Sequence, residues 1–191
     1  MTDHRMRCGW CAGDALYVAY HDQEWGVPIT ETQSLFKLLT LEGMQAGLSW
    51  LTILRKRAAM EEAFYDFNID KLAASSERDV VGWLDNPGII RHRGKLQAMI
   101  NNARVTLEAD DFVERIWQFR PTQAKTYTSL REVPALTNES TALSKVLKKM
   151  GFKFVGPTIC YAFMQSAGLV NDHIEDCWRF APCDFLQAQI D

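Results

Sequence analysis

The chain contains 191 residues, of which 47% are hydrophobic and 24% are charged, and its net charge is −3. These values are ordinary for a globular protein, and no apolar run approaches the roughly 20 residues that a membrane-spanning helix needs. The slightly acidic balance excludes a protein that holds nucleic acid through its overall charge, so any such contact has to come from local basic patches.

The N-terminal stretch M-T-D-H-R-M-R-C is polar and lacks the apolar segment of a signal peptide. The chain has five cysteines, and this odd number argues against a full disulfide framework. We therefore expect a cytoplasmic protein with reduced thiols.

Helix signals dominate the chain. The stretch T-E-T-Q at Thr30–Gln33 has the form of a capping box, and it predicts an amphipathic helix that runs towards Leu54 with Gly43 and Gly47 inside it. Strand patterns are scarce, so the sequence predicts an all-α fold, and residues 120–138 are its least patterned part. Further helices are predicted after Ser76, over 94–105, over 141–150 and from Pro157 to Gly168, with a turn or helix from Asn171.

Two glycines, Gly151 and Gly156, bound a tight turn between two of these helices. Such a turn exposes backbone N–H groups beside a helix N-terminus, and these groups bind phosphate oxygens without reading sequence. Lys148, Lys149 and Lys153 add positive charge nearby. This clustering favours a phosphate contact over an ordinary packing corner.

Potential metal ligands gather near both ends of the chain. His173 and Cys177 are four residues apart, which on a helix places them on one side, close enough to share one Zn²⁺. The remaining two ligands of a tetrahedral site are either Cys8 with Cys11 or Cys8 with His21. Either set predicts a closed, structural zinc site that joins the two chain ends.

The stretch C-G-W-C also has the spacing of a redox dithiol formed by Cys8 and Cys11. That interpretation requires a preceding strand and a following helix in an alternating α/β chain. Only seven residues precede Cys8, and they are mostly polar, so a thiol oxidoreductase is the weaker alternative.

Glu42 continues the apolar stripe of its predicted helix and is therefore expected to point inward. A buried carboxylate needs a partner, and aromatic rings crowd the neighbouring stretches. Rings supply stacking and cation–π attraction, and a carboxylate accepts N–H bonds. The pattern predicts a pocket for a flat, electron-poor or cationic ring, built from Trp10, Tyr17, Tyr20, Trp25, Glu42 and Trp50.

Several long stretches together resemble the 3-methyladenine DNA glycosylase I family. They are R-C-G-W, L-Y-V-A-Y-H-D-x-E-W-G-V-P, L-E-G-x-Q-A-G-L-S-W, G-I-I-R-H-R-G-K and K-x-x-G-F-K-F-V-G-x-T-I-C-Y-x-F-M-Q-x-x-G-L-V-N-D-H. The resemblance implies a two-lobed helix-hairpin-helix fold in a single domain, residues 1–191, with a hairpin lobe at roughly 76–168. It implies an enzyme that releases 3-methyladenine hydrolytically from double-stranded alkylated DNA, without strand cleavage. One catalytic domain that acts on a flipped base does not require a dimer, so we expect a monomer.

The same resemblance implies roles for individual residues. The structural zinc falls on Cys8, His21, His173 and Cys177, which leaves Cys11 outside the site. Glu42 is the catalytic residue, Tyr17, Tyr20 and Trp50 recognise the base, and Trp10 and Trp25 line the pocket. Gln45 and Leu48 push into the DNA stack, and Gly151, Lys153 and Gly156 lie in the phosphate-holding turn.

Asn171 occupies the position where the wider superfamily usually carries a catalytic aspartate, and Asp172 is next to it. No lysine stands at an evident nucleophile position in the hairpin, in keeping with a glycosylase that forms no Schiff base. The main competing hypothesis is a zinc-containing helix-hairpin-helix module that binds damaged or branched DNA without catalysis.

Overall fold

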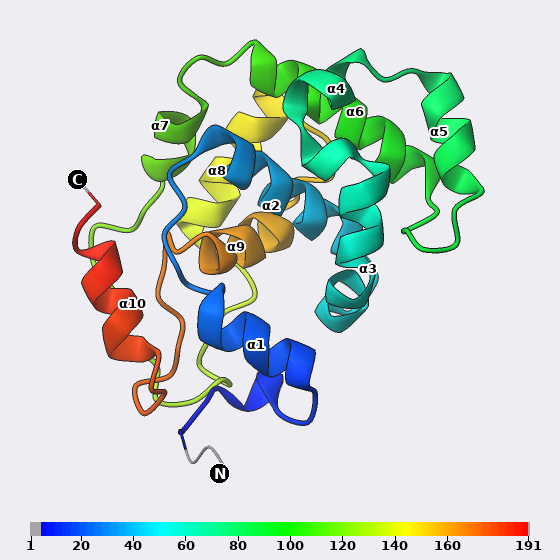
Figure 1. The fold of residues 1–191 in the computed structure, drawn as a ribbon. Coiled ribbons are helices and arrows are strands. Elements are labelled where there is room, and N and C mark those ends of the chain that lie inside the picture. Colours follow the sequence, from blue (N-terminus) through cyan, green and yellow to red (C-terminus); the bar gives the residue numbers. More distant parts are fainter. Residues whose placement is uncertain (1–4, 191) are drawn as a thin grey trace.

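The structure is a computed structural model that describes residues 5–190, and the regular elements of this part of the chain are all helices, joined by turns and loops (Figure 1). Within it an isolated bridge between Tyr127 and Ile174 is the only β-type pairing, so the all-α prediction is confirmed. The elements are η1 Gly9–Cys11, α1 Ala15–Gln23, α2 Thr32–Gln45, α3 Trp50–Ala63, η2 Tyr65–Phe67, α4 Ile69–Ala74, α5 Glu77–Leu84, α6 Arg93–Leu107, α7 Phe112–Trp117, α8 Asn138–Met150, α9 Pro157–Ser166 and α10 Phe180–Gln187.

Helix α2 lies at the centre of the molecule and contacts α3, α6, α7 and α9 (Figure 1). Its apolar side chains divide between two hydrophobic clusters: Phe36, Leu41 and Met44 belong to the first, and Leu35 and Leu39 to the second. A helix that is apolar on several sides is buried by its neighbours. Helix α2 is therefore the shared wall of two packed halves, as the two-lobed fold requires.

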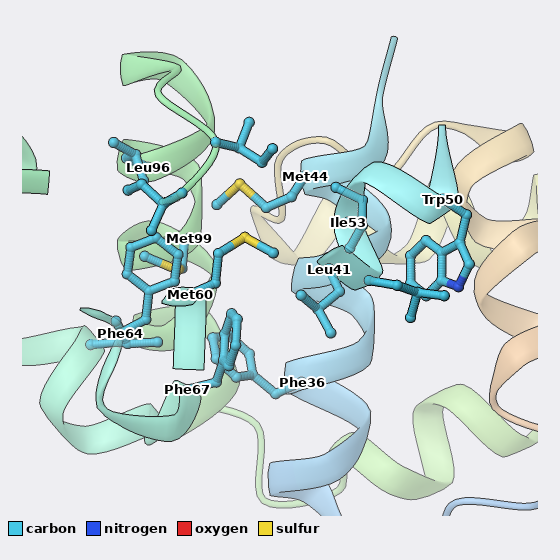
Figure 2. Packing of buried hydrophobic residues seen from close by; sticks show 14 of the residues in the cluster. Phe36, Leu41, Met44, Trp50, Ile53, Met60, Phe64, Phe67, Leu96 and Met99 are labelled. Atoms are coloured by element: carbon cyan, nitrogen blue, oxygen red, sulfur yellow. The ribbon is translucent and has the colours of Figure 1, made fainter. Parts of the chain in front are cut away.

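The first cluster packs α2 against α3, η2 and α6, as Figure 2 shows for its aromatic and sulfur-containing side chains. The second cluster packs α2 against α7, α8 and α9, with Phe112, Leu143, Leu147, Phe163 and Met164 fully buried. Burying each such side chain stabilises the fold by roughly 1.5–3 kcal/mol. Among the described helices, none combines the length and apolar character that crossing a membrane requires.

The prediction of one helix from Thr30 to Leu54 is wrong, because the chain turns between α2 and α3. Helix α2 ends at Gln45, and Gly47 adopts a positive φ of 79°. Ser49 then begins α3, with its hydroxyl accepting a hydrogen bond from the backbone N–H of Thr52 at 3.2 Å. The apolar pattern continues across the turn since both helices bury one side against the same core.

The expected capping box at Thr30–Gln33 is also absent from the described structure. Glu31 is the N-cap of α2 and makes no side-chain cap. The Gln33 amide bonds instead to the backbone of the segment after η2, donating to the Phe67 carbonyl at 2.6 Å and accepting from the Ile69 N–H at 3.3 Å. A long-range contact therefore replaces the local one.

Other boundaries agree with the sequence or differ by a few residues. The capping box formed by Ser76 and Asp79 is present at the start of α5, and α9 begins at Pro157 as predicted. Helix α8 starts at Asn138, capped by Thr137, rather than at residue 141. Residues 171–178 form turns rather than a helix. Helices α1, α4, α7 and α10 are additional elements that the sequence patterns do not predict.

The two ends of the chain lie together. The segment between α9 and α10 returns to the N-terminal segment (Figure 1), and the Trp178 N–H donates to the Met6 carbonyl at 3.0 Å. On the other side of this segment, the Glu175 N–H donates to the Tyr127 carbonyl at 2.9 Å. This return places His173 and Cys177 beside α1.

Gly168 permits a close approach at the end of α9. It has a positive φ of 72°, and a Cβ there would lie 2.5 Å from the Pro28 nitrogen and 2.6 Å from the Val27 carbonyl carbon. The segment that follows α1 therefore packs directly on backbone, and it is fixed by a 3.1 Å hydrogen bond from the Ile29 N–H to the Ala167 carbonyl.

We predict that Gly168→Ala lowers the free energy of unfolding by roughly 3 kcal/mol or more, because it adds left-handed strain to a backbone clash. Gly82→Ala in α5 is the matched control. Its Cβ would meet nothing within 4 Å, and alanine favours a helix by about 0.5–1 kcal/mol. Urea denaturation measures both, and equal stabilities would contradict the role of Gly168.

Candidate functional site

Helix α1 carries three side chains of the site on one face. Asp14 begins the helix by accepting hydrogen bonds from the N–H groups of Leu16 and Tyr17, at 2.9 and 3.4 Å. Tyr17, Tyr20 and His21 then fall three and four residues apart, so they point to the same side. The helix ends at Gln23, and Trp25 follows in the turn.

Four buried side chains converge where the chain ends meet. The ligand atoms of Cys8, His21, His173 and Cys177 all lie within 4.8 Å of one another. Cys177 Sγ is 3.4 Å from His21 Nε2 and 3.5 Å from His173 Nδ1, and Cys8 Sγ is 3.6 Å from the same Nδ1. The structure thus brings together the set that includes His21.

Cys11 lies outside this group. Its thiol donates to the Cys8 carbonyl oxygen at 3.1 Å, within the turn of η1. Burial raises the pKa of the Cys11 thiol, and the hydrogen bond to Cys177 together with burial raises the pKa of Cys8. A redox dithiol needs an accessible thiol with a lowered pKa, so this geometry argues against a Cys8–Cys11 oxidoreductase.

The outer nitrogen of each imidazole has a fixed partner. His173 Nε2 lies 3.1 Å from the Trp25 carbonyl, which only accepts, so this nitrogen carries the proton and the lone pair of the neutral ring is on Nδ1. His21 Nδ1 lies 2.8 Å from an Asp22 carboxylate oxygen, and its Nε2 accepts from the Cys8 N–H. The lone pair of each neutral ring is consequently on the nitrogen nearer the sulfurs, 3.4 Å from Cys177 Sγ for His21 and 3.5 Å for His173, as in rings that ligate a metal.

Asp22 is itself held in place by its neighbours. Arg7 donates to both carboxylate oxygens, at 2.8 to 3.1 Å, and Trp178 Nε1 donates at 3.2 Å. Partial burial alone would raise its pKa, but the hydrogen bonds from Arg7, His21 and Trp178 lower the pKa of Asp22 to about 2. The carboxylate is charged at neutral pH and fixes the His21 ring.

The hydrogen bond from the Cys8 thiol holds the pKa of Cys177 well below its usual range. A buried thiolate, a second thiol and two imidazole lone pairs directed at one point form a group that can hold a metal ion. All four ligands come from protein, and all four are buried, so the group is closed to water.

A cavity of about 340 Å³ lies next to this cluster. Trp10 forms one end of it and packs edge-on against Tyr17 and Trp25, each with a centroid distance of 5.0 Å. Tyr20 and Trp50 lie 5.4 Å apart. The complete lining is Trp10, Tyr17, Tyr20, Trp25, Glu42, Gln45, Trp50, Leu130, Val133, Ala162, Gln165, Ser166 and Asp172.

Glu42 lies at the base of a hydrogen-bonded chain. The Tyr20 hydroxyl donates to Ser166 Oγ at 3.0 Å, and the Ser166 hydroxyl donates to Glu42 Oε1 at 2.8 Å. Among the described residues nothing hydrogen-bonds the other oxygen, Oε2, or the indole N–H of Trp50, although both atoms are buried. These two groups are the polar atoms that a bound ring would satisfy.

Burial raises the pKa of Glu42 to about 8, against a smaller lowering by the Ser166 hydrogen bond. The carboxyl is therefore mostly protonated at neutral pH in the free protein. A buried acid of this kind ionises readily only when a positive charge arrives beside it. A cavity with such a group and perturbed pKa is the strongest candidate site in the molecule.

The other predicted site residues lie on neighbouring elements. Gln45 ends α2 and lines the cavity, whereas Leu48 is 41% exposed in the turn before α3. The turn with Gly151, Lys153 and Gly156 connects α8 to α9 and packs on α2, where Gly43 approaches Phe154.

The structure adds cavity residues that sequence reasoning missed. Ser166 and Gln165 come from α9, where their polar character in an apolar helix was an available signal. Leu130 and Val133 come from the unpatterned segment 120–138, which carried no signal. Asp172 lines the cavity and accepts hydrogen bonds from Tyr161 and Gln165, at 2.6 and 2.8 Å.

Asn171 takes a different direction from Asp172 and donates to the Phe180 carbonyl at 2.9 Å. A larger cavity, of about 630 Å³, lies beyond Asp172 between residues 120–127 and α10. Its lining contains neither a tryptophan nor Glu42. Two tyrosines, Tyr127 and Tyr161, are its aromatic lining residues. The smaller cavity is therefore the one that combines tryptophan and tyrosine rings with the carboxyl of Glu42.

An all-helical chain with a hairpin of α8 and α9, a buried Cys₂His₂ group and an aromatic cavity with one carboxyl has the features of the helix-hairpin-helix class of base-recognising proteins. The sequence pattern of the methyladenine glycosylase family matches residues 10–180, and the chain belongs to this family.

Individual relatives agree with this assignment. The DNA-3-methyladenine glycosylase 1 of Escherichia coli K12 is 52% identical over 177 residues, which cover 90% of this chain and 95% of the relative. A crystal structure of 3-methyladenine DNA glycosylase I superposes with a TM-score of 0.88 at 51% identity, covering 91% of this chain and 98% of that chain. A second such structure, a variant in complex with 3-methyladenine, has a TM-score of 0.86 at 38% identity and covers 91% and 97%.

We predict that Glu42→Gln stabilises the free protein increasingly as the pH rises. In the wild type the stabilising contribution of the raised pKa is complete below the unfolded value of about 4.5 and is lost as the pH rises through about 8. Glutamine does not titrate, so the difference grows over this interval by up to about 1.4 kcal/mol per pH unit.

Urea unfolding at pH 5, 7 and 9 measures this difference. Glu62→Gln, on an exposed face of α3, controls for the loss of one carboxyl group. A Glu42→Gln stability difference that is constant from pH 5 to 9 would contradict the buried, protonated state of Glu42.

Proposed function

We propose that this chain is a DNA glycosylase that extrudes 3-methyladenine from alkylated double-stranded DNA and releases it by hydrolysis. One observation carries the proposal. Two buried polar atoms, Glu42 Oε2 and Trp50 Nε1, have no hydrogen-bond partner among the described residues, and both residues line the aromatic cavity of about 340 Å³. The relatives described above bear the name of this activity, and one of them has been solved with 3-methyladenine bound.

Glu42 and the rings discriminate by charge and by hydrogen bonding. Methylation at N3 leaves adenine in DNA positively charged, and a cation lowers the pKa of a buried carboxyl. Ionised Glu42 then accepts hydrogen bonds from the adenine edge, including N6–H. Guanine presents O6 in the corresponding place, so an acceptor would face an acceptor. Tyr17, Tyr20 and Trp50 recognise the ring by stacking and polar contact, and Trp10 and Trp25 close the walls.

The reaction needs little covalent chemistry from the protein. A 3-methylated adenine departs as a neutral base without being protonated, so the main tasks are to extrude it, to exclude bulk water and to admit one hydrolytic water. Extrusion costs a few kcal/mol, and stacking on aromatic rings returns about 1–3 kcal/mol per base. Among the residues that line the described cavity there is no lysine, which supports hydrolysis without a Schiff base.

Two elements supply the DNA contacts in this proposal. Gln45 and Leu48 enter the base stack at the lesion, since Leu48 is exposed at the tip of the turn between α2 and α3. The backbone of Gly151, Lys153 and Gly156 holds phosphates at the start of α9. One chain supplies every group of the proposed site, in keeping with a monomer. The cytoplasmic location that we expect from the sequence stays a prediction.

The proposed cofactor is one structural Zn²⁺ held by Cys8, His21, His173 and Cys177. Two thiolates and two imidazoles are a donor set that zinc prefers, and the lone pairs of both rings face the sulfurs. When bound, the ion supplies a fixed link between the chain ends. The aromatic residues of α1 are then held against the cavity, whose far wall comes from α9.

The activity is tested by incubating the protein with methylated DNA and identifying the released bases by mass spectrometry. We expect free 3-methyladenine, and Glu42→Gln should lower the excision rate roughly 100-fold or more, as loss of a charge partner at a reacting base does. Glu62→Gln should leave the rate unchanged. DNA binding without release would support the non-catalytic module instead, and an equal effect of the two variants would remove Glu42 from the mechanism.

The metal is tested by comparing Cys8→Ser with Cys11→Ala. We expect Cys8→Ser to lose the zinc equivalent and to lower the melting temperature by roughly 10 °C, because a structural zinc contributes directly to folding free energy. Cys11→Ala should retain zinc and activity. Elemental analysis and thermal unfolding provide the two readouts, and a Cys8→Ser protein with a full zinc equivalent would refute this ligand set.

A further inference from the structure

Lys95 is a buried cation without a carboxylate partner among the described residues. It lies in the first turn of α6 and is only 6% exposed. Burial lowers its pKa, and its ammonium group donates to two backbone oxygens, the Met44 carbonyl at 2.8 Å and the Ala46 carbonyl at 2.6 Å. A lysine is rarely buried unless its charge is compensated, and here the two backbone oxygens provide that compensation.

The two carbonyls belong to the last turn of α2 and to the turn that follows it. The final carbonyls of a helix have no partner within the helix, and the helix dipole makes this end negative. The ammonium of Lys95 therefore satisfies both oxygens and fixes the backbone on which Gln45 and Leu48 stand. Gly47, with a φ of 79°, lies immediately beyond and allows the chain to reverse.

The same face of α6 also holds the hairpin turn. Asn102 is seven residues after Lys95, which is two helical turns and about 10 Å along the axis. Its side chain bonds to both backbone groups of Lys153, donating to the carbonyl at 2.9 Å and accepting from the N–H at 2.8 Å. Asn101 donates to the Gly151 carbonyl at 2.8 Å.

We propose that Lys95 is a positioning residue for base extrusion and that α6 sets the separation between the wedge turn, residues 45–49, and the phosphate-holding turn, residues 151–156. This inference rests on the proposed glycosylase function. Neither Lys95 nor Asn102 is among the residues that line the 340 Å³ cavity. They act through the backbone of the two turns that meet DNA. The contribution of Lys95 appears when a paired base must be pushed out of the duplex, and that of Asn102 whenever a duplex is bound.

The test uses Lys95→Met in the full chain, with duplexes that carry one 3-methyladenine either paired with thymine or opposite an abasic site. Methionine keeps most of the volume but removes the donor from the buried Met44 carbonyl and from the partly buried Ala46 carbonyl. Excision from the paired duplex should fall roughly 10- to 100-fold. Opposite an abasic site the base is already unpaired, so the rate should return to within about threefold of the wild type.

Further readouts separate positioning from general damage. Affinity for free 3-methyladenine, measured by quenching of tryptophan fluorescence, should be unchanged in Lys95→Met, because the cavity is intact. Lys95→Arg keeps a cation with several donors and should recover part of the paired-duplex rate. Lys37→Met is the control: it also removes one lysine charge, in this case from α2 itself, but its ammonium pairs with the Glu61 side chain rather than with the wedge turn.

Asn102→Asp tests the other end of α6. The carboxylate retains the acceptor for the Lys153 N–H but loses the donor to its carbonyl. Because both duplexes need the phosphate contact, we expect this variant to lose activity on the two substrates equally.

A Lys95→Met protein that loses activity equally on paired and unpaired lesions, or that binds the free base less tightly, would overturn the inference. So would full activity on the paired duplex. If the wild type releases no base from either duplex, the proposed function itself is wrong. Should Lys95→Met fail to fold, the ratio of the two rates in Lys95→Arg decides the question, since an unchanged ratio contradicts a positioning role.

Discussion

The burial of the Glu42 carboxyl is the constraint around which the rest of the site is arranged. Removing a carboxylate from water costs several kcal/mol, and here one oxygen receives a single hydrogen bond while the other receives none within the described structure. The free protein meets this cost by keeping the group protonated, with its pKa raised to about 8. No lysine or arginine is among the described residues that line the cavity, so none offers Glu42 a positive partner. The surrounding walls must therefore exclude water by staying rigid.

That rigidity comes from the way the chain closes. One wall of the cavity is formed by residues 10–25, and another by residues 162–172, near the opposite end of the sequence. Between them lies the Cys₂His₂ cluster, whose outer contacts reach Asp22 on one side and the Trp25 carbonyl on the other. The cluster thus acts on the cavity indirectly: it holds α1 and the segment after α9 at a fixed distance.

The position of Glu42 was predictable because it continues an apolar stripe, and the burial of α2 bears this out. The ligand set was not predictable from spacing alone, since Cys11 and His21 were equal candidates until the resemblance to a family decided between them. The structure separates them by a local contact, the Cys11 thiol donating to the Cys8 carbonyl. The spacing of His173 and Cys177 correctly predicts that the two side chains lie close together. The helix assumed for that spacing is absent, because the two residues lie in turns.

The break between α2 and α3 could not be predicted from the apolar pattern, because both helices face the same core and the pattern runs on across Gly47. Only the need for a positive φ marks the turn. Leu130 and Val133 were equally hidden, since residues 120–138 have no periodicity and reach the cavity by tertiary packing alone. Local sequence thus defines the helices and the inward carboxyl, while long-range contacts complete the walls.

The protonated state of the Glu42 carboxyl in the free protein also affects which bases the cavity binds. At pH 7 the ionisation of a group with a pKa of about 8 costs about 1.4 kcal/mol. In the proposed function an alkylated adenine offsets this cost by its own positive charge in a cavity of low polarity, where charge pairs are strong. An unmodified adenine brings no charge, so it gains less from the same rings and leaves Glu42 protonated. The preference for a damaged base then arises because the positive charge of the base favours the loss of the proton from the buried Glu42 carboxyl. A permanently ionised, exposed carboxylate would not provide this preference.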